Sequence, residues 1–435
     1  DQVVNFNACQ CAIIRKHSPG RTILHNYMGS FTAFDHYKVS EALDAASWDS
    51  YPLGFLDRDT GDDAFKERYL RVGHPDLQAF HHDLYRACGR GRWWVMEQQP
   101  GPVNWAPFNP SPAPGAVRLW AYEAFAAGAE VVSYFRWRQA PFAQEQMHEA
   151  LLLPNSEPNE AFHVVSAVSK ELAALDASVE TARADVALVF DYESEWAWQI
   201  QPQGRDFSYL GLVTAMYTAL RRHGISVDVI PPTVEAVQGR KLVLAPGLFT
   251  ATDTFVDALK SSGADVAIGP RTGSKTENFT IPDALPPGAF NRLIDIKVRR
   301  VESIRPGIAI NRAGSNAGHH FSKWREFIVA GDGVSKDVLS DDGEAMLLSQ
   351  GKTSYLAGWP DPDFALEIVT RLLAKAGLAS RLLHEDIRIR DNGKRRHVLN
   401  YGPDPVDISA IIGDAKLLIG QNPLPPCGVA VFDLE

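Results

Sequence analysis

Short apolar runs of strand length alternate with longer segments of helical periodicity along the first 180 residues. The apolar runs lie at 22–27, 47–51, 93–97 and 131–137. The segments with helical periodicity lie at 34–46, 76–91, 115–129 and 159–175. Because strands that alternate with helices form parallel sheets, this part of the chain predicts four βα units. Four such units are half of a (β/α)8 TIM barrel, whose active site lies in the loops at the C-terminal ends of its strands.

A second series of strands and helices follows the first. Its strands are expected at 184–190, 226–230, 241–247 and 264–269. Its helices are expected at 207–223 and 252–262. This pattern predicts an open, doubly wound α/β sheet of the flavodoxin-like kind. It carries no glycine-rich nucleotide motif and no Cys or Ser nucleophile at a strand-to-helix turn, so we expect a scaffold or an oligomer interface.

From about residue 381 onward the apolar runs are short. They lie at 386–391, 395–401, 407–413 and 428–435. They predict a small antiparallel β domain. We therefore expect three domains: the C-terminal half of a TIM barrel at 1–180, an α/β oligomerisation domain at 181–380 and the small β domain at 381–435.

The composition and net charge of the chain indicate which kinds of molecule it binds. The 435 residues are 45% hydrophobic and carry a formal net charge of −10. The chain can therefore bury large cores, but it has no general electrostatic attraction for nucleic acid or for an anionic membrane. No run of about 18 apolar residues predicts a membrane span, and the four cysteines form neither a disulfide framework nor a C-x-x-C pair. We expect no cofactor and no metal, and a partner that is a small neutral molecule or another protein.

A carboxylate ends the third predicted strand. In the stretch RWWVMEQQPGPVNW, residues 92–105, the apolar run closes on Glu97 and a Pro-rich loop follows. At the C-terminal end of a barrel strand, a carboxylate is typical of catalysis and not of packing. A buried ion pair with Arg92 or Arg138 would explain the residue equally simply, and position alone does not choose between the two.

Aromatic residues are concentrated around this carboxylate in the sequence. Most of the ten tryptophans lie between residues 48 and 198. Flat, amphipathic rings suit the apolar faces of sugar rings, while Asn, Gln, His and carboxylates suit their hydroxyls. Trp93, Trp120 and Trp137 are expected to fill the barrel and its ring of helices, whereas Trp105 stands in a loop.

The loop after the fourth strand contains Glu145 and His148. On one helical turn, residues three apart lie side by side. The pair could bind a metal, but the local sequence lacks the third ligand that a metal needs. Binding adjacent hydroxyls is the more economical function, and a solvated helix start is the alternative.

Several long strings resemble one known family. MEQQPGPVNW, VRLWAYEAFAAGAE, YFRWRQAPFAQEQMH and SWDSYPLG are similar to the second half of the catalytic barrel of family 42 glycoside hydrolases, the retaining β-galactosidases. The later strings VALVFDYESEWAWQ and YLAGWPD resemble the second domain of that family. The resemblance covers nearly the whole chain and implies a hydrolase that cleaves terminal β-D-galactosides.

Carried over to this sequence, the resemblance implies that Glu97 is the catalytic nucleophile. A retaining hydrolase uses one carboxylate to attack the sugar and a second, roughly 5 to 5.5 Å away, as acid and base. Tyr51 is similar to the tyrosine that donates a hydrogen bond to the nucleophile in such barrels. A hydrogen bond to the charged form keeps the pKa of a carboxylate low despite partial burial.

The resemblance also assigns the sugar-binding residues and the assembly. Trp105 and Phe135 match the aromatic wall of the sugar subsite. Glu145 and His148 match the pair that binds galactose hydroxyls. The family further implies a homotrimer held largely by the second domain, a cytoplasmic location and no redox cofactor.

The second catalytic carboxylate of the family is not found in this chain. In the family it follows an asparagine at the end of the fourth strand, whereas this sequence is expected to begin just before the fifth. Glu41, Glu67 and Glu123 belong to predicted helices or outer loops, and Glu130 precedes a strand. The acid/base is therefore unknown, and the chain alone is expected to be inactive.

A half barrel exposes two unpaired sheet edges and makes a poor folding unit. We therefore expect the missing N-terminal half of the barrel to be a partner of this chain. The family's zinc-binding cysteines also belong to that half, so the cysteines here are not assigned to it. The alternative is a non-catalytic carbohydrate-binding protein with a degenerate barrel.

Overall fold

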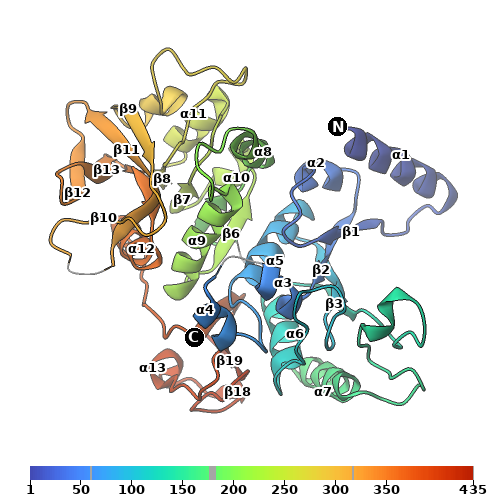
Figure 1. Cartoon of the computed structure of the whole chain (residues 1–435). Coiled ribbons are helices and arrows are strands. Elements are labelled where there is room, and N and C mark those ends of the chain that lie inside the picture. The colour runs from blue at the N-terminus through green and yellow to red at the C-terminus, as the bar shows by residue number, and fades with distance from the viewer. Residues whose placement is uncertain (59–60, 176–182, 316–317, 435) are drawn as a thin grey trace. The chain divides into compact units, whose positions relative to one another are not determined.

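The computed structural model describes residues 1–58, 61–175, 183–315 and 318–434 (Figure 1). The chain divides into two compact units. The first is built from Asp1–Arg183 and Leu383–Glu435, and the second from Ala184–Leu382. The C-terminal residues therefore belong to the same unit as the N-terminal ones.

The first unit contains a four-stranded parallel sheet. Its strands lie side by side in sequence order: β1 (Leu24–Met28), β2 (Ala45–Ser50), β3 (Trp93–Gln98) and β4 (Val131–Tyr134). The helices before, between and after them are α1 (Gln2–His17), α2 (His36–Ser40), α3 (Pro52–Arg58), α4 (Asp63–Arg68), α5 (Leu77–Cys88), α6 (Ala116–Ala126) and α7 (Glu160–Ala174) (Figure 1). The four predicted strands are therefore present and parallel. Their C-terminal ends lie together at one end of the sheet.

Large aromatic side chains fill the core of this unit. Trp48, Trp93 and Trp120 are fully buried. The predicted core positions of Trp93 and Trp120 are therefore confirmed. The prediction for Trp137 is wrong, because its side chain is 63% exposed in the loop that follows β4.

The helix predicted at 34–46 is much shorter in the structure. α2 begins after Asp35, whose carboxylate accepts a hydrogen bond from Lys38 N at 3.2 Å. Ala45 and Ala46, which the prediction placed in the helix, instead begin β2 and pair with β1. Alanine favours helices by propensity, but burial between two neighbouring strands outweighs that preference.

The C-terminal residues form a small antiparallel sheet, as predicted. Its strands are β16 (Ile387–Asn392), β17 (Arg395–Asn400), β19 (Val429–Asp433) and β18 (Leu417–Ile419), in that order. The strand predicted at 407–413 is wrong, because this segment contains the short helix α13 (Ser409–Ile412). Asp407 accepts a hydrogen bond from Ser409 N at 2.9 Å and so starts a turn instead of a strand.

Buried ion pairs attach this sheet to α5. Arg388 on β16 binds the two carboxylate oxygens of Asp76 with hydrogen bonds of 2.7 Å each, directly before α5 begins. Arg390 donates to Asp83 at 3.0 Å within α5. α5 also contacts β2. The C-terminal strands therefore hold α5, the helix that lies against the four-stranded parallel sheet of the first unit.

The second unit contains a seven-stranded mixed sheet. Its order is β12 (Ser335–Leu339), β13 (Ala345–Gln350), β14 (Thr353–Leu356), β8 (Asp265–Ile268), β7 (Leu242–Ala245), β5 (Val186–Val189) and β6 (Val227–Ile230). The pairings from β14 to β6 are parallel, and β12 and β13 extend one side in antiparallel fashion. Counted along the chain, the parallel strands follow the flavodoxin-like order 2-1-3-4-5. The predicted α/β sheet is therefore confirmed, and its antiparallel extension is an addition to the prediction.

Within residues 184–315 and 318–382, the remaining elements of the second unit are five α-helices, one 3-10 turn and an antiparallel sheet. The helices are α8 (Tyr192–Ile200), α9 (Tyr209–Arg222), α10 (Val234–Val237), α11 (Asp253–Ser261) and α12 (Pro362–Lys375), and the turn is η2 (Gly288–Arg292). The sheet consists of β9 (Ile296–Ser303), β10 (Ile310–Asn311), β11 (His320–Ala330) and β15 (Gly358–Pro360). The pattern of apolar residues did not predict this sheet.

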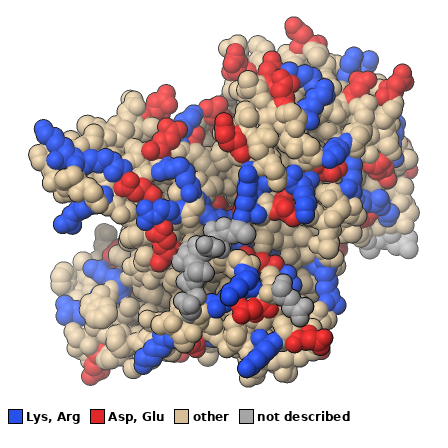
Figure 2. Space-filling model, turned by 180° about the vertical axis from the view of Figure 1, so that it is seen from behind, with Lys and Arg blue, Asp and Glu red and all other residues tan. Residues whose placement is uncertain are grey.

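The sequence predicts neither a basic surface nor a helix that spans a membrane. On the face drawn in Figure 2, Lys and Arg lie among Asp and Glu instead of forming one continuous basic area. Within the described ranges, the helices are all too short or too polar to cross a membrane.

Candidate functional site

Polar side chains from three neighbouring strands meet near the C-terminal edge of the parallel sheet. Asp49 on β2 and Glu97 on β3 are register partners in adjacent parallel strands. Asn26 on β1 reaches Glu97, with 3.2 Å between Asn26 Nδ2 and Glu97 Oε1. Tyr51 follows β2 directly. We refer to Asn26, Asp49, Tyr51 and Glu97 as the strand-end cluster.

Two neutral donors hold the Glu97 carboxylate. The Tyr51 hydroxyl donates to Oε2 at 2.6 Å, and the Asn26 amide donates to Oε1. Arg92 instead binds Glu130, at 2.7 and 3.0 Å, and Arg138 donates to Ser156. The alternative in which Arg92 or Arg138 pairs with Glu97 is therefore wrong.

Tyr51 is well suited to remain a hydrogen-bond donor. Its side chain is buried, and burial followed by the hydrogen bond to Glu97 raises the pKa of the phenol far above its ordinary value. The phenol therefore keeps its proton at any physiological pH. Its ring meets Trp105 edge-on at 5.7 Å and His148 edge-on at 5.6 Å between ring centroids.

Asp49 is a second carboxyl group beside Glu97. Burial and then the charge of Glu97 raise the pKa of Asp49 to about 7, and the Asn26 side chain lowers it in part. The Oδ1 atom of Asp49 is buried and has no hydrogen-bond partner within the described residues. Asp49 therefore keeps its proton to a much higher pH than an ordinary aspartic acid.

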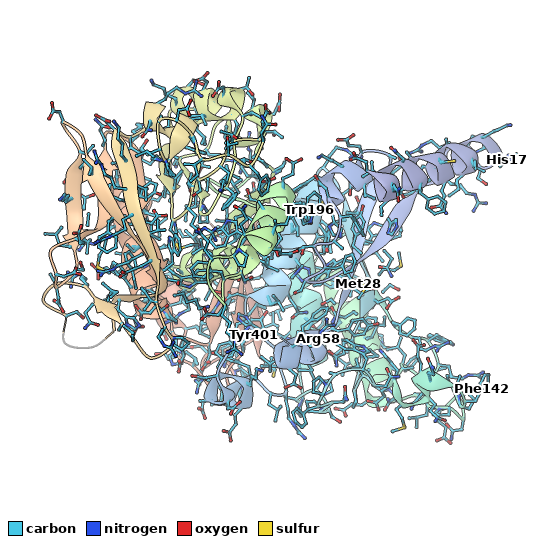
Figure 3. All side chains as sticks on the ribbon, turned by 45° about the horizontal axis from the view of Figure 1, so that its top comes forward. His17, Met28, Arg58, Phe142, Trp196 and Tyr401 are labelled. Carbon is cyan, nitrogen blue, oxygen red and sulfur yellow. The ribbon has the colours of Figure 1, made fainter. Side chains whose placement is uncertain are left out.

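Trp105 forms one wall beside the strand-end cluster. Its side chain is 39% exposed and packs over Gly54 of α3 so closely that a Cβ there would lie 2.4 Å from the ring. The Arg58 guanidinium lies 5.7 Å from the Trp105 ring centroid, and Figure 3 labels Arg58 at the end of α3. A ring that is fixed on one side and exposed on the other can bind a flat apolar surface.

Phe135 and His148 follow β4. Their rings meet edge-on at 5.2 Å. His148 is buried, and burial lowers the pKa of its imidazole, against which the charges of Glu145 and Glu97 act. The imidazole is therefore neutral at pH 7. Its Nδ1 donates to the Glu149 carbonyl oxygen at 3.3 Å, which leaves Nε2 as an acceptor. The same loop carries Phe142, which is 71% exposed and extends away from the rest of the unit in Figure 3.

Glu145 lies in the short 3-10 helix η1 (Gln144–Met147) and not in an α-helical turn. Its carboxylate accepts a hydrogen bond from Arg136 at 3.2 Å, and its side chain is 51% exposed. The charge of Glu145 raises the pKa of both His148 and Tyr51. The Glu145 carbonyl oxygen accepts a hydrogen bond from His148 N at 3.0 Å, whereas its carboxylate is bound by Arg136. The structure thus brings Glu97, Tyr51 and His148 together, whereas the carboxylate of Glu145 is exposed beside them.

Two members of the strand-end cluster were not predicted from the sequence. Asn26 and Asp49 lie inside the runs 22–27 and 47–51, which predicted only strands. A polar side chain near the C-terminal end of a parallel strand was the available signal, the same one that identified Glu97. In the described part of the chain, His, Cys, Asp and Glu do not gather in groups of three or more that could hold a metal.

Two family profiles match this chain. The family 42 glycoside hydrolase profile, described as beta-galactosidase, matches residues 1–175. The profile described as beta-galactosidase trimerisation domain matches residues 184–379.

Relatives and a solved structure are similar over all or nearly all of the chain. Beta-galactosidase of Thermus thermophilus is 49% identical over 434 residues, which cover 100% of this chain and 66% of that protein. Beta-galactosidase Bga of Halorubrum lacusprofundi is 35% identical, covering 94% and 62%. The crystal structure of beta-galactosidase from the psychrophilic Marinomonas ef1 superimposes with a TM-score of 0.96 at 42% identity, covering 100% and 67%. The chain thus spans about two thirds of the length of these proteins.

Proposed function

This chain belongs to glycoside hydrolase family 42, and from that premise we propose that it forms the larger part of a retaining β-galactosidase. The enzyme would cleave terminal β-D-galactosides by double displacement. The observation that carries this proposal is the environment of Glu97, whose two oxygens each accept a hydrogen bond from a neutral donor. These two hydrogen bonds hold the carboxylate in place.

Glu97 acts as the nucleophile in the proposed mechanism. One of its oxygens bonds to the anomeric carbon while the bond to the leaving oxygen breaks, and an acid protonates that oxygen. Water, deprotonated by the same group acting as base, then displaces Glu97 and regenerates the carboxylate. Two displacements at one carbon retain its configuration. Tyr51 and Asn26 hold the carboxylate in its attacking position before each turnover.

Trp105, Phe135, Glu145 and His148 are proposed to bind the sugar. The exposed face of Trp105 and the ring of Phe135 suit the apolar face of a galactose ring. Neutral His148 can accept a hydrogen bond from a hydroxyl at Nε2, because its Nδ1 already donates to Glu149 O, and Glu145 can accept from a neighbouring hydroxyl. Ring contacts support the grouping, because Tyr51, which donates to Glu97, meets both Trp105 and His148 edge-on, and His148 meets Phe135.

The acid/base is proposed to come from a part of the full-length protein that this chain does not span. The relatives are longer by about a third of their length. Within the described residues, β1 and β4 are the two edges of their sheet. Four further βα units would pair both edges and complete a (β/α)8 barrel. The chain on its own is proposed to be inactive.

We also propose that the full-length enzyme is a homotrimer held by residues 184–379, the part that matches a trimerisation domain. Sedimentation of the full-length protein should give three times the mass of one protomer, and a stable monomer would contradict the proposal.

We further propose that the full-length enzyme is located in the cytoplasm and that galactosides are imported as short chains. Fractionation of the source cells tests the location.

Covalent trapping tests the proposed function directly. The full-length enzyme is incubated with a 2-deoxy-2-fluoro-β-galactoside that carries a dinitrophenyl leaving group, and the labelled peptide is sequenced. We expect one equivalent of sugar attached to Glu97. Binding of galactose without any label would instead support the carbohydrate-binding alternative, and a label on another carboxylate would refute the assignment of Glu97.

Gly54→Ala tests the sugar-binding role of Trp105. The new methyl group would lie 2.4 Å from the present ring position, so the indole must tilt. We expect KM for an aryl β-galactoside to rise about three- to tenfold, as a loss of roughly 1 kcal/mol gives, with a smaller change in kcat. Steady-state kinetics of the full-length enzyme measures both.

A double-mutant cycle controls for effects that bypass Trp105. If Gly54→Ala acts through the indole, it adds nothing to the loss that Trp105→Ala already causes. Independent losses that add would show that Gly54 matters for another reason. Ala is the better helix former, so the melting temperature of Gly54→Ala should not fall through α3 itself.

A further inference from the structure

The amide of Asn26 faces two carboxyl groups. Its Nδ2 atom lies 3.2 Å from Glu97 Oε1, and its hydrogen bonding also lowers the pKa of Asp49. Asp49 and Glu97 stand side by side as register partners on β2 and β3. The single amide is thus the shared neighbour of the proposed nucleophile and of a carboxyl group that has no role in the double displacement.

The surroundings of Asp49 favour its neutral form. Its Oδ1 is buried without a hydrogen-bond partner in the described residues, and an ionised oxygen in that state is costly. The groups that interact with it are Glu97 on β3, Asn26 on β1, Tyr51 after β2 and Tyr85 on α5. None of these four carries a positive charge. A second negative charge beside Glu97 would also be repelled by the first.

We infer that Asp49 is a positioning residue that acts through Asn26: while protonated, it leaves the Asn26 amide directed at Glu97 Oε1. This inference rests on the proposed function of Glu97. A neutral carboxyl group is the weaker acceptor, so the amide stays with the charged Glu97. When Asp49 ionises, it becomes a charged acceptor and competes for the same amide. The amide is then drawn toward Asp49, and its hydrogen bond to Glu97 lengthens and weakens.

The test isolates the attack by Glu97 from acid catalysis. In the full-length enzyme, the Glu97 carboxylate bonds to the anomeric carbon of a dinitrophenyl 2-deoxy-2-fluoro-β-galactoside, and dinitrophenolate departs with the bonding electrons. Dinitrophenolate needs no proton to leave, so the rate of its release does not depend on the acid/base. The rate constant of this single burst is measured from pH 5.5 to pH 8.5.

We expect the wild-type rate constant to fall severalfold as the pH rises through about 7, the pKa of Asp49. Asp49→Asn cannot ionise, so its rate constant should show no fall over the same pH range. Asn26→Ala should react about 10- to 100-fold more slowly, as expected for a lost hydrogen bond to a charged group, and should also show no fall. Melting temperatures confirm that each variant is folded.

The possible results separate the inference from the proposed function. A fall of equal size in Asp49→Asn or in Asn26→Ala would overturn the inference, as would a wild-type rate constant that does not fall. Because Asn26→Ala leaves Asp49 in place, it decides the question even if Asp49→Asn does not fold. Labelling of Glu97 in every case would leave the proposed function standing, whereas the absence of any label in the wild type would remove both.

Discussion

Glu97→Gln in the full-length enzyme is expected to lower kcat for an aryl β-galactoside by about a thousandfold or more. Glutamine keeps the shape of the side chain and can still contact Tyr51 and Asn26, but its amide oxygen is a poor nucleophile. The expected loss is therefore chemical and not structural. Steady-state kinetics measures it, and retention of more than about one per cent of the rate would refute the role of Glu97.

Glu130→Gln is the matched control. Glu130 lies just before β4, where it binds Arg92 at 2.7 Å and Trp94 Nε1 at 2.9 Å. Its side chain is partly exposed, and an exposed ion pair contributes about 1 kcal/mol at most. We expect kcat to remain near the wild-type value in this variant.

The product formed with azide identifies the role of the carboxylate. If Glu97 is the nucleophile, azide can enter the space of the lost carboxylate in Glu97→Ala and attack a dinitrophenyl β-galactoside. The product is then α-galactosyl azide, and dinitrophenolate leaves. A β-galactosyl azide would instead mean that Glu97 is the acid/base. This result distinguishes the two catalytic carboxylates even though removing either one slows turnover.

Arg388→Met is expected to destabilise the first unit by about 3–5 kcal/mol. The Arg388 and Asp76 side chains are 4% and 2% exposed, so removing the guanidinium leaves a buried carboxylate without its main counter-charge. The loss should appear as a lower melting temperature of the full-length enzyme. Kinetics at 25 °C should change little in the fraction that remains folded, because neither residue belongs to the strand-end cluster.

Two controls show whether burial is the cause. Arg395→Met removes a more exposed pair with Asp433 on the same sheet, and such pairs contribute about 0–1 kcal/mol. Replacing both Arg388 and Asp76 with apolar residues should recover part of the loss, because no charge is left buried. Equal shifts in Arg388→Met and Arg395→Met would contradict this explanation.

Some of the site could be predicted because its signals are local. Glu97 ends an apolar run, and Trp105 follows a Pro-rich loop, so both positions could be recognised from neighbouring residues alone. The role of Asn26 could not, because it depends on a side chain 71 positions away in the chain. The contact between Tyr51 and Glu97 likewise joins residues 46 positions apart, and only the family resemblance suggested it.

The periodic pattern of apolar residues, read without any structure, determined the parallel strands of the first unit, the α/β character of the second and the carboxylate at the end of β3. The spacing of apolar residues in a segment depends only on the sequence of that segment, and it indicates whether the segment forms a strand or a helix. Only the tertiary structure decided that Ala45 and Ala46 extend a strand, that Trp137 is exposed and that Asn26 and Asp49 join Glu97. These outcomes depend on which strands become neighbours and in which register they pair. Strand pairing is determined by contacts between residues that are far apart in the sequence.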